Sequence, residues 1–243
     1  MSVALLAAMT AETEPVRALM RDVTQRVEKG LVMQSGWLAE QEVVLVTTGV
    51  GKVMAATAAT MTLLLASTRP RAMINFGVAG ALSPSLSKGD VVVARAVVHH
   101  DVDVSAFGYA PGQVVGCPPQ FRSDPALLAA AKAGVAALGW ECGVGLLASG
   151  DQFVQGTDQQ ARIRLAFTDV VAVDMEAAAL AQVCHRFSLP FVAVKAVSDG
   201  AGEAARAQFE QDLAQVCGRC ALVLPSLLQA LSGPALSLAQ GRA

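Results

Sequence analysis

Short apolar runs rich in β-branched residues alternate with longer helix-like stretches along almost the whole chain, and no other feature of the sequence constrains the fold as strongly. This alternation favours an α/β protein, in which helices cover both faces of a sheet. The runs that predict strands are Val3–Ala8, Val43–Thr48, Ala72–Phe76, Val91–Val98, Gly143–Leu147, Val170–Val173 and Phe191–Val197. We therefore expect a three-layer α/β sandwich with a central mixed β-sheet flanked by helices.

Helices are expected between these runs. One follows the first strand, another begins at Val53, and the others cover Pro125–Leu138, Gln159–Phe167, Glu176–Phe187 and Ala204–Leu231. Pro15 suits the first turn of the first helix, and Pro225 predicts a break or kink in the last one. We expect one domain over residues 1–232 and a flexible tail over 233–243, where Gly, Pro and Ser recur.

Composition argues against two classes of partner. The 243 residues are 53% apolar and carry a formal net charge of −2 without a basic block, so nucleic acid is not an expected partner. The mean hydropathy of +0.48 requires a search for membrane spans. Val53–Thr68 is shorter than the ~18 to 20 residues that a span needs, and Cys220–Gly241 is interrupted by Pro and polar residues. We expect a well-covered sheet and no membrane association.

The N-terminus and the cysteines predict a cytoplasmic protein. Met1–Met9 lacks a positively charged start and runs into Glu12, so it indicates a buried strand rather than a signal peptide. The five cysteines are odd in number and form no secreted-type framework. Cys217 and Cys220 have C-x-x-C spacing but lie in a predicted helix without a second pair, which favours buried thiols over a zinc site.

Several carboxylates directly follow predicted strands. Glu12 comes after the first strand, Asp174 and Glu176 after a later one, and Asp199 after the last. In α/β folds ligands bind beyond the carboxyl ends of the strands. Each acid alone is explained by a helix dipole or a turn. Together they would repel one another unless one is protonated or a polar ligand lies between them, which favours a functional site.

Ordered blocks of residues carry a family resemblance. They are Ala8-Met9…Glu12, Thr48-Gly49-Val50-Gly51-Lys52, Asn75-Phe76-Gly77-Val78-Ala79-Gly80, Asp103-Val104-Ser105-Ala106-Phe107-Gly108-Tyr109, Ser149-Gly150-Asp151-Gln152-Phe153, Val173-Asp174-Met175-Glu176-Ala177 and Ser198-Asp199. In these blocks the chain resembles the 5'-methylthioadenosine/S-adenosylhomocysteine nucleosidases, within the wider purine nucleoside phosphorylase-like group. The resemblance extends from the N-terminus to about residue 230. It implies a hydrolase that cleaves the N-glycosidic bond of both nucleosides and releases adenine, without a cofactor or metal.

The resemblance also implies roles for individual residues. Glu12 would orient and activate the attacking water, Glu176 would hold the ribose hydroxyls, and Asp199 would protonate N7 of adenine. The implied substrate-binding residues of the same subunit are Met9, Val50, Val78, Phe153, Val154, Met175, Ser198 and Phe209. In a homodimer, the pocket for the 5'-thio group would be completed by Val104, Phe107 and Tyr109 of the partner subunit.

These residue types suit glycosidic cleavage. Nearby carboxylates stabilise an oxocarbenium-like sugar electrostatically, and proton donation to a poor leaving group contributes ~100- to 10,000-fold. Three positions depart from the resemblance. Val78 stands where a small or hydroxylated residue is expected, Asp174 stands where Glu is common, and the loop Gly200–Glu203 lacks a second Asp seen in some relatives.

Two other motifs have structural explanations. His99 and His100 are neighbours on a predicted strand, so their side chains point to opposite faces and do not easily share a metal ion. Gly49-Val50-Gly51-Lys52 lacks the spacing of a phosphate-binding loop, and we expect a strand-to-helix turn.

Three alternative functions remain open from the sequence. A purine nucleoside phosphorylase would need Arg or several amide donors for phosphate, and the loop that begins at Met9 has no Arg before Arg17. A futalosine-type nucleosidase would differ mainly in the substituent at the 5' position. A non-catalytic nucleoside-binding protein on the same fold is disfavoured because Glu12, Glu176 and Asp199 are all present.

Overall fold

The computed structural model describes residues 1–232, and the predicted tail 233–243 lies outside the described residues. The predicted strands are confirmed in order. They correspond to β1 (Val3–Ala7), β4 (Gln41–Thr47), β5 (Met73–Ala81), β6 (Val91–His99), β8 (Cys142–Ser149), β9 (Val170–Asp174) and β10 (Phe191–Asp199). Three strands were not predicted from the sequence, namely β2 (Arg21–Glu28), β3 (Leu31–Leu38) and the short β7 (Phe121–Arg122). β2 is a largely exposed edge strand, so its polar sequence has no apolar alternation to reveal it.

The helices also agree with expectation, except at two prolines. They are α1 (Thr10–Arg17), α2 (Lys52–Leu65), α3 (Pro125–Ala136), α4 (Thr157–Ala166), α5 (Ala177–Arg186) and α6 (Ala205–Ser232). The prediction for Pro15 was wrong, because α1 begins at Thr10 and Pro15 lies in its second turn. The break predicted at Pro225 was also wrong, since the non-helical residue in α6 is Asp212. Leu224 and Leu227 beside Pro225 are fully buried, and this packing keeps the helix continuous there.

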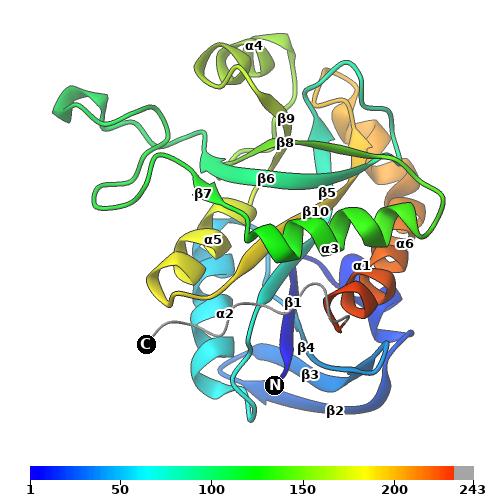
Figure 1. Cartoon of the computed structure of the whole chain (residues 1–243). Coiled ribbons are helices and arrows are strands. Elements are labelled where there is room, and N and C mark those ends of the chain that lie inside the picture. The colour runs from blue at the N-terminus through cyan, green and yellow to red at the C-terminus, as the bar shows by residue number, and fades with distance from the viewer. Residues whose placement is uncertain (233–243) are drawn as a thin grey trace.

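All the strands belong to one mixed sheet. The order is β10-β6-β8-β9-β5-β1-β4-β3-β2, with β7 paired to β6. β10 also pairs with β5, which closes β5, β9, β8, β6 and β10 into a barrel-like ring. Strands β1, β4, β3 and β2 extend from β5 as an open sheet (Figure 1).

Helices cover both faces of the sheet, as expected for a three-layer sandwich. In β1, Val3, Leu5 and Ala7 pack in one core with α1, α3 and α6, whereas Ala4 and Leu6 pack in another core with α2 and α5. This division follows from the alternation of side chains along a strand. Figure 1 shows α3 and α6 on one side of the strands and α2 and α5 on the other.

One strand of the ring exchanges its neighbour part-way along its length. The first half of β5 pairs with β1 as far as Leu6↔Asn75, and its last residues pair with β9 from Gly80↔Val173. Between Asn75 and Gly80 neither strand pairs with this side of β5. Such an exchange opens a crevice at the carboxyl ends of parallel strands, where ligands bind in α/β sheets.

The segment between β6 and β7 stands away from the body of the molecule (Figure 1). It contains a short 3-10 helix, Ser105–Phe107, and Phe107 is 82% exposed. Val115 in the same segment is also exposed. An apolar, projecting segment of this kind is typical of a surface that meets a partner.

Among the described residues, one helix is long and apolar enough to span a membrane by length and composition, over Ala205–Leu231. This region of α6 packs against α1, α3 and β10. Cys220, Val223 and Leu227 are completely buried in the core that these elements share. A core helix passes the same test, so the observation is weak evidence for a span.

Candidate active site

A cavity of about 280 Å³ lies at the crevice beside β5. The residues expected at the site from the same subunit all line it, namely Met9, Glu12, Val50, Val78, Phe153, Val154, Met175, Glu176, Ser198, Asp199 and Phe209. Val104, Phe107 and Tyr109 do not line the cavity, because they lie on the projecting segment between β6 and β7. Within one subunit, the residues expected from the same subunit therefore lie together at the cavity, whereas those expected from the partner subunit lie away from it.

Glu12 is held by backbone N–H groups from two sides. It lies in the first turn of α1, where its Oε2 accepts a hydrogen bond from Met9 N at 2.8 Å. Its Oε1 accepts a hydrogen bond from Val78 N at 2.9 Å. Val78 lies in the part of β5 that no longer pairs with β1. Gly77 makes room for the carboxylate, because a Cβ there would lie 2.2 Å from Oε1. The departure at Val78 thus removes a side-chain hydroxyl but leaves a backbone donor.

Glu12 is buried, and burial raises the pKa of its carboxyl group. Lys195 and the N–H groups of Val78 and Met9 offset only part of this effect. A carboxylate with a raised pKa is suited to accept a proton, because its basicity lies closer to neutrality.

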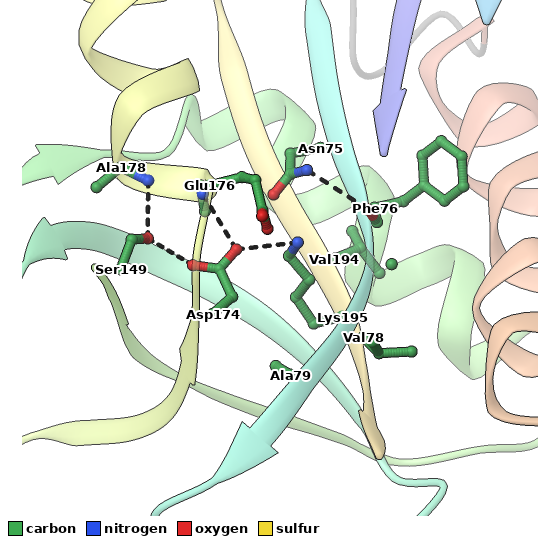
Figure 2. A network of polar contacts seen from close by, with 12 residues as sticks. Asn75, Phe76, Val78, Ala79, Ser149, Asp174, Glu176, Ala178, Val194 and Lys195 are labelled. Carbon is green, nitrogen blue, oxygen red and sulfur yellow. Dashed lines mark hydrogen bonds and ion pairs between the residues drawn. The ribbon is translucent and has the colours of Figure 1, made fainter. Parts of the chain in front are cut away.

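Lys195 is the functional residue that the sequence analysis missed. It lies in the middle of β10 and is 2% exposed, with Nζ at 3.0 Å from Asp174 Oδ2 (Figure 2). Burial alone would lower the pKa of Lys195, but Asp174, Glu176 and Glu12 outweigh burial and raise it. Its signal in the sequence is a single cation inside a strand whose residues are otherwise apolar up to Ser198.

Asp174 is anchored so that it can balance this buried ammonium group. Ser149 Oγ donates to Asp174 Oδ1 at 2.5 Å, and Ala177 N donates to Oδ2 at 3.0 Å. Ala178 N in turn donates to Ser149 Oγ, so the start of α5 holds both side chains (Figure 2). A buried ion pair is tolerated only when further hydrogen bonds satisfy its atoms, and this network supplies them.

Glu176 is a second buried carboxyl group whose pKa is raised. Burial first, and then the charge of Asp174, raise its pKa from the ordinary 4.5 to about 7. Lys195 and a hydrogen bond from Gly51 N to Oε1, 2.9 Å long, act in the opposite direction. The carboxylates thus do repel one another, as expected, but the lysine that reduces this repulsion was not predicted.

Asp199 lies at the end of β10 on another wall of the cavity. Ser198 Oγ donates to Asp199 Oδ2 at 2.7 Å, and Ala201 N donates to Oδ1 at 2.8 Å. Ser198 therefore holds the side chain of Asp199 in place. These two donors fix the carboxyl group in the lining of the cavity, where it can meet a ligand.

The remaining wall is apolar and aromatic. The rings of Phe153 and Phe209 meet edge to face, with centroids 5.9 Å apart. Met9 and Met175 line the same cavity and offer soft, polarisable contacts. The cavity therefore has an acidic part beside β5 and an apolar part beside α6, which suits a nucleoside with an apolar substituent.

A larger and more open hollow, of about 740 Å³, lies between residues 118–124 and the end of α5. Its one lining carboxylate is Asp124, which accepts hydrogen bonds from Ala126 N and Leu127 N and caps α3. Because this acid already has a structural role, the smaller cavity is the better candidate for chemistry.

The glycine turn, the histidine pair and the cysteine pair noted in the sequence have structural roles in the fold. Gly49–Lys52 forms the turn from β4 to α2, as expected. His99 Nε2 lies 3.0 Å from Gln182 Oε1, while the ring of His100 lies against Gly150. Cys217 and Cys220 are buried free thiols. Within residues 1–232, no three His, Cys, Asp or Glu side chains are grouped so that they could hold a metal ion.

Comparisons with known proteins agree with this geometry. The sequence model of the Phosphorylase superfamily matches residues 2–230 of this chain. The 5'-methylthioadenosine/S-adenosylhomocysteine nucleosidase of Geobacillus thermodenitrificans (strain NG80-2) is 43% identical over 97% of this chain and 99% of the relative. The chain belongs to the 5'-methylthioadenosine/S-adenosylhomocysteine nucleosidase family.

Solved structures of this nucleosidase family superpose closely. The enzyme of Neisseria meningitidis in complex with methylthio-immucillin-A matches with a TM-score of 0.92 at 40% identity, over 95% of this chain and 99% of that one. The Streptococcus pneumoniae enzyme with the transition-state inhibitor MT-ImmA matches with a TM-score of 0.90 at 37% identity, over 95% and 100%. A futalosine hydrolase of Helicobacter pylori also matches, with a TM-score of 0.88 but only 29% identity, over 94% and 97%.

The raised pKa of Glu176 makes the stability of the nucleosidase depend on pH. Between its ordinary pKa of 4.5 and its folded value of about 7, the folded protein binds a proton that the unfolded chain releases. The free energy of unfolding therefore falls as pH rises through this window. Glu176→Gln should remove this fall in the free energy of unfolding, which is on the order of 3 kcal/mol. Urea unfolding at about pH 4.5 and about pH 8 measures it.

Glu14→Gln is the matched control, because Glu14 lies on the exposed side of α1. It should keep the pH dependence of the wild-type protein. Equal pH dependence in Glu176→Gln and the wild type would show that Glu176 has no raised pKa.

Proposed function

We propose that this chain hydrolyses the N-glycosidic bond of 5'-methylthioadenosine and S-adenosylhomocysteine, producing adenine and the 5-thio-substituted ribose. The observation that carries the proposal is the buried Glu12 carboxylate, held by Met9 N and Val78 N beside the apolar cavity. Identity of 43% with a nucleosidase of this name supports it. A futalosine-type activity is less well supported, because the match to that hydrolase is only 29% identical.

The roles of the three acids follow from their positions. Glu12 accepts a proton from a water molecule that attacks the anomeric carbon, and its raised pKa suits it to that step. Glu176 accepts hydrogen bonds from the ribose hydroxyls. Asp199, steadied by Ser198, delivers a proton to N7 of the departing adenine.

The charges around the sugar favour bond cleavage. As the glycosidic bond lengthens, positive charge develops on the ribose ring, and the carboxylates of Glu12 and Glu176 lower the energy of that charge. Lys195 would oppose this effect, but its ammonium group is paired with Asp174. Asp174 therefore leaves the two glutamates free to act on the sugar.

The nonpolar contacts account for recognition of the base and of the sulfur substituent. Phe153 offers a ring face to adenine, and the backbone of Val154 lies beside it in the cavity wall. Met175 packs against the sugar. Met9, Val50 and Phe209 surround the 5'-thio group with apolar surface.

The lining of the cavity argues for water rather than phosphate as the nucleophile. No arginine lines it within the described part of the chain, and Glu12 already occupies the N–H groups of Met9 and Val78. A phosphate dianion would meet a carboxylate there instead of the donors that it needs. The proposed chemistry requires acids and bases that the chain itself provides, so we expect no cofactor or metal.

The decisive experiment is to incubate the protein with methylthioadenosine in the presence and absence of phosphate. We expect adenine and free methylthioribose in both cases, at rates that a chelator does not change. Chromatography with mass detection identifies the sugar. Methylthioribose 1-phosphate as the product, or a strict need for phosphate, would show a phosphorylase instead.

Removing either proton-handling acid should impair the chemical step. We expect Glu12→Gln and Asp199→Asn each to lower kcat by ~100-fold or more, because each side chain moves a proton in the reaction. Steady-state kinetics measures kcat, and circular dichroism checks that both variants are folded. A folded variant with wild-type kcat would remove that residue from the mechanism.

We also propose a homodimer that works in the cytoplasm. The five cysteines are all free thiols, which is typical of a reducing compartment. The apolar projecting segment carries Val104, Phe107 and Tyr109, and it suits contact with a second copy whose 5'-thio pocket these side chains would complete.

The dimer has a direct test. Phe107→Ser should weaken self-association and raise the KM for methylthioadenosine, because Phe107 would contribute to the pocket of the other subunit. Analytical ultracentrifugation and steady-state kinetics measure the two effects on one preparation. A wild-type monomer that is fully active at assay concentration would contradict the proposal.

A further inference from the structure

Three loops meet at the N-terminus of α2. Lys52 Nζ lies 2.5 Å from Asp101 Oδ1, and Asp101 Oδ2 accepts a hydrogen bond from Asp151 N at 2.9 Å. Asp151 Oδ1 in turn accepts a hydrogen bond from Lys52 N at 2.7 Å. We call Lys52, Asp101 and Asp151 the loop clamp. Its members follow β4, β6 and β8, which are not consecutive in the sequence.

Ordinary helix capping explains only part of the clamp. A carboxylate at the N-terminus of a helix is favourable, and Asp151 fills that role. Lys52 has the wrong charge for the first residue of a helix, and Asp101 compensates it with a second carboxylate. The two side chains are only 18% and 16% exposed. Burial would raise the pKa of Asp101, but Lys52 and Asp151 N outweigh burial and lower it, so Asp101 stays ionised.

Gly51 connects the clamp to the site. Its N–H donates to Glu176 Oε1 at 2.9 Å, and the residue adopts a φ of 98°, which favours glycine. A Cβ at Gly51 would lie 3.0 Å from Asp151 Oδ1, so the clamp packs directly against this backbone. The hydrogen bond from Lys52 N to Asp151 fixes the peptide group that follows Gly51.

We propose that Lys52, Asp101 and Asp151 are positioning residues that hold the Gly51 N–H on Glu176 and so fix its carboxylate for the ribose hydroxyls. The assignment of the ribose to Glu176 rests on the proposed function. One oxygen of Glu176 is oriented by the backbone, which leaves the other free for substrate. Asp101 also lies two residues after the end of β6, at the start of the projecting segment. The clamp therefore joins that segment to Glu176.

The first test compares Asp101→Ala and Lys52→Met with the wild-type protein. Both variants should lower kcat/KM for methylthioadenosine by about 10- to 100-fold, because a small displacement of a positioned group has an effect of this size. Their affinity for adenine, which has no ribose, should not change. Lys52→Arg keeps the charge and should restore most of the activity. Asp169→Asn, which breaks the exposed ion pair with Arg95, is the matched control and should have no effect.

A second test separates positioning from a general loss of structure. Asp101→Ala should have little further effect in a Glu176→Gln background, because both changes act through the same carboxylate. Wild-type kcat/KM in folded Asp101→Ala and Lys52→Met, or an undiminished loss in the Glu176→Gln background, would overturn the proposal.

The clamp can also be tested without enzymatic activity. The charged and polar groups that face Glu176 are Asp174, Lys195, Glu12 and Gly51 N. Weakening the bond from Gly51 N should raise the pKa of Glu176, so its carboxyl carbon should titrate at higher pH in Asp101→Ala when followed by NMR. An unchanged titration would overturn the proposal. A wild-type protein that does not act on methylthioadenosine would defeat the proposed function alone, and this titration would still decide on the clamp.

Discussion

The ion pair between Lys195 and Asp174 is the interaction on which the rest of the site depends. Glu12 and Glu176 are both buried next to it, and buried carboxylates without a nearby cation would be neutral over most of the pH range. The ammonium group lowers the pKa of both glutamates, although burial still keeps their pKa values raised. Lys195 therefore limits the rise that burial causes in the pKa of both glutamates, and it does so without lining the cavity itself.

This charge cluster requires a rigid support, because an ion pair out of water is stabilising only in good geometry. The ring of β5, β10, β6, β8 and β9 provides it, since Lys195 and Asp174 both belong to its strands. Glu12 comes from α1, outside the ring, and reaches it through the N–H of Val78. Glu12 and Asp199, the acids that we propose to act on the two ends of the glycosidic bond, are thus supported by different elements, α1 and β10.

The fold was largely predictable because buried strands and helices have distinct patterns. The exposed β2 was missed because its residues face water, and Pro225 was misread because tertiary packing overrides its local effect. Every site residue assigned to one subunit lies at the cavity, since acids that follow parallel strands meet at one rim. Lys195 and the backbone donors Gly51 N and Val78 N were not foreseen. A lysine inside an apolar strand only interrupts the hydrophobic pattern and does not itself indicate a function. Backbone donors cannot be recognised from the types of side chain in a sequence.

The change of neighbour along β5 affects which reactions such a sheet can host. Where β1 has ended and β9 has not begun, the N–H of Val78 points to an open side of the strand, and the carboxylate of Glu12 occupies it. Backbone N–H groups can donate hydrogen bonds to any anion of suitable size. A chain with the same strand exchange but no acid in the first loop would offer this donor to a free anion from solution. The sheet thus supplies an anion position that different chains can fill in different ways, and one side chain decides between an internal base and a bound co-substrate.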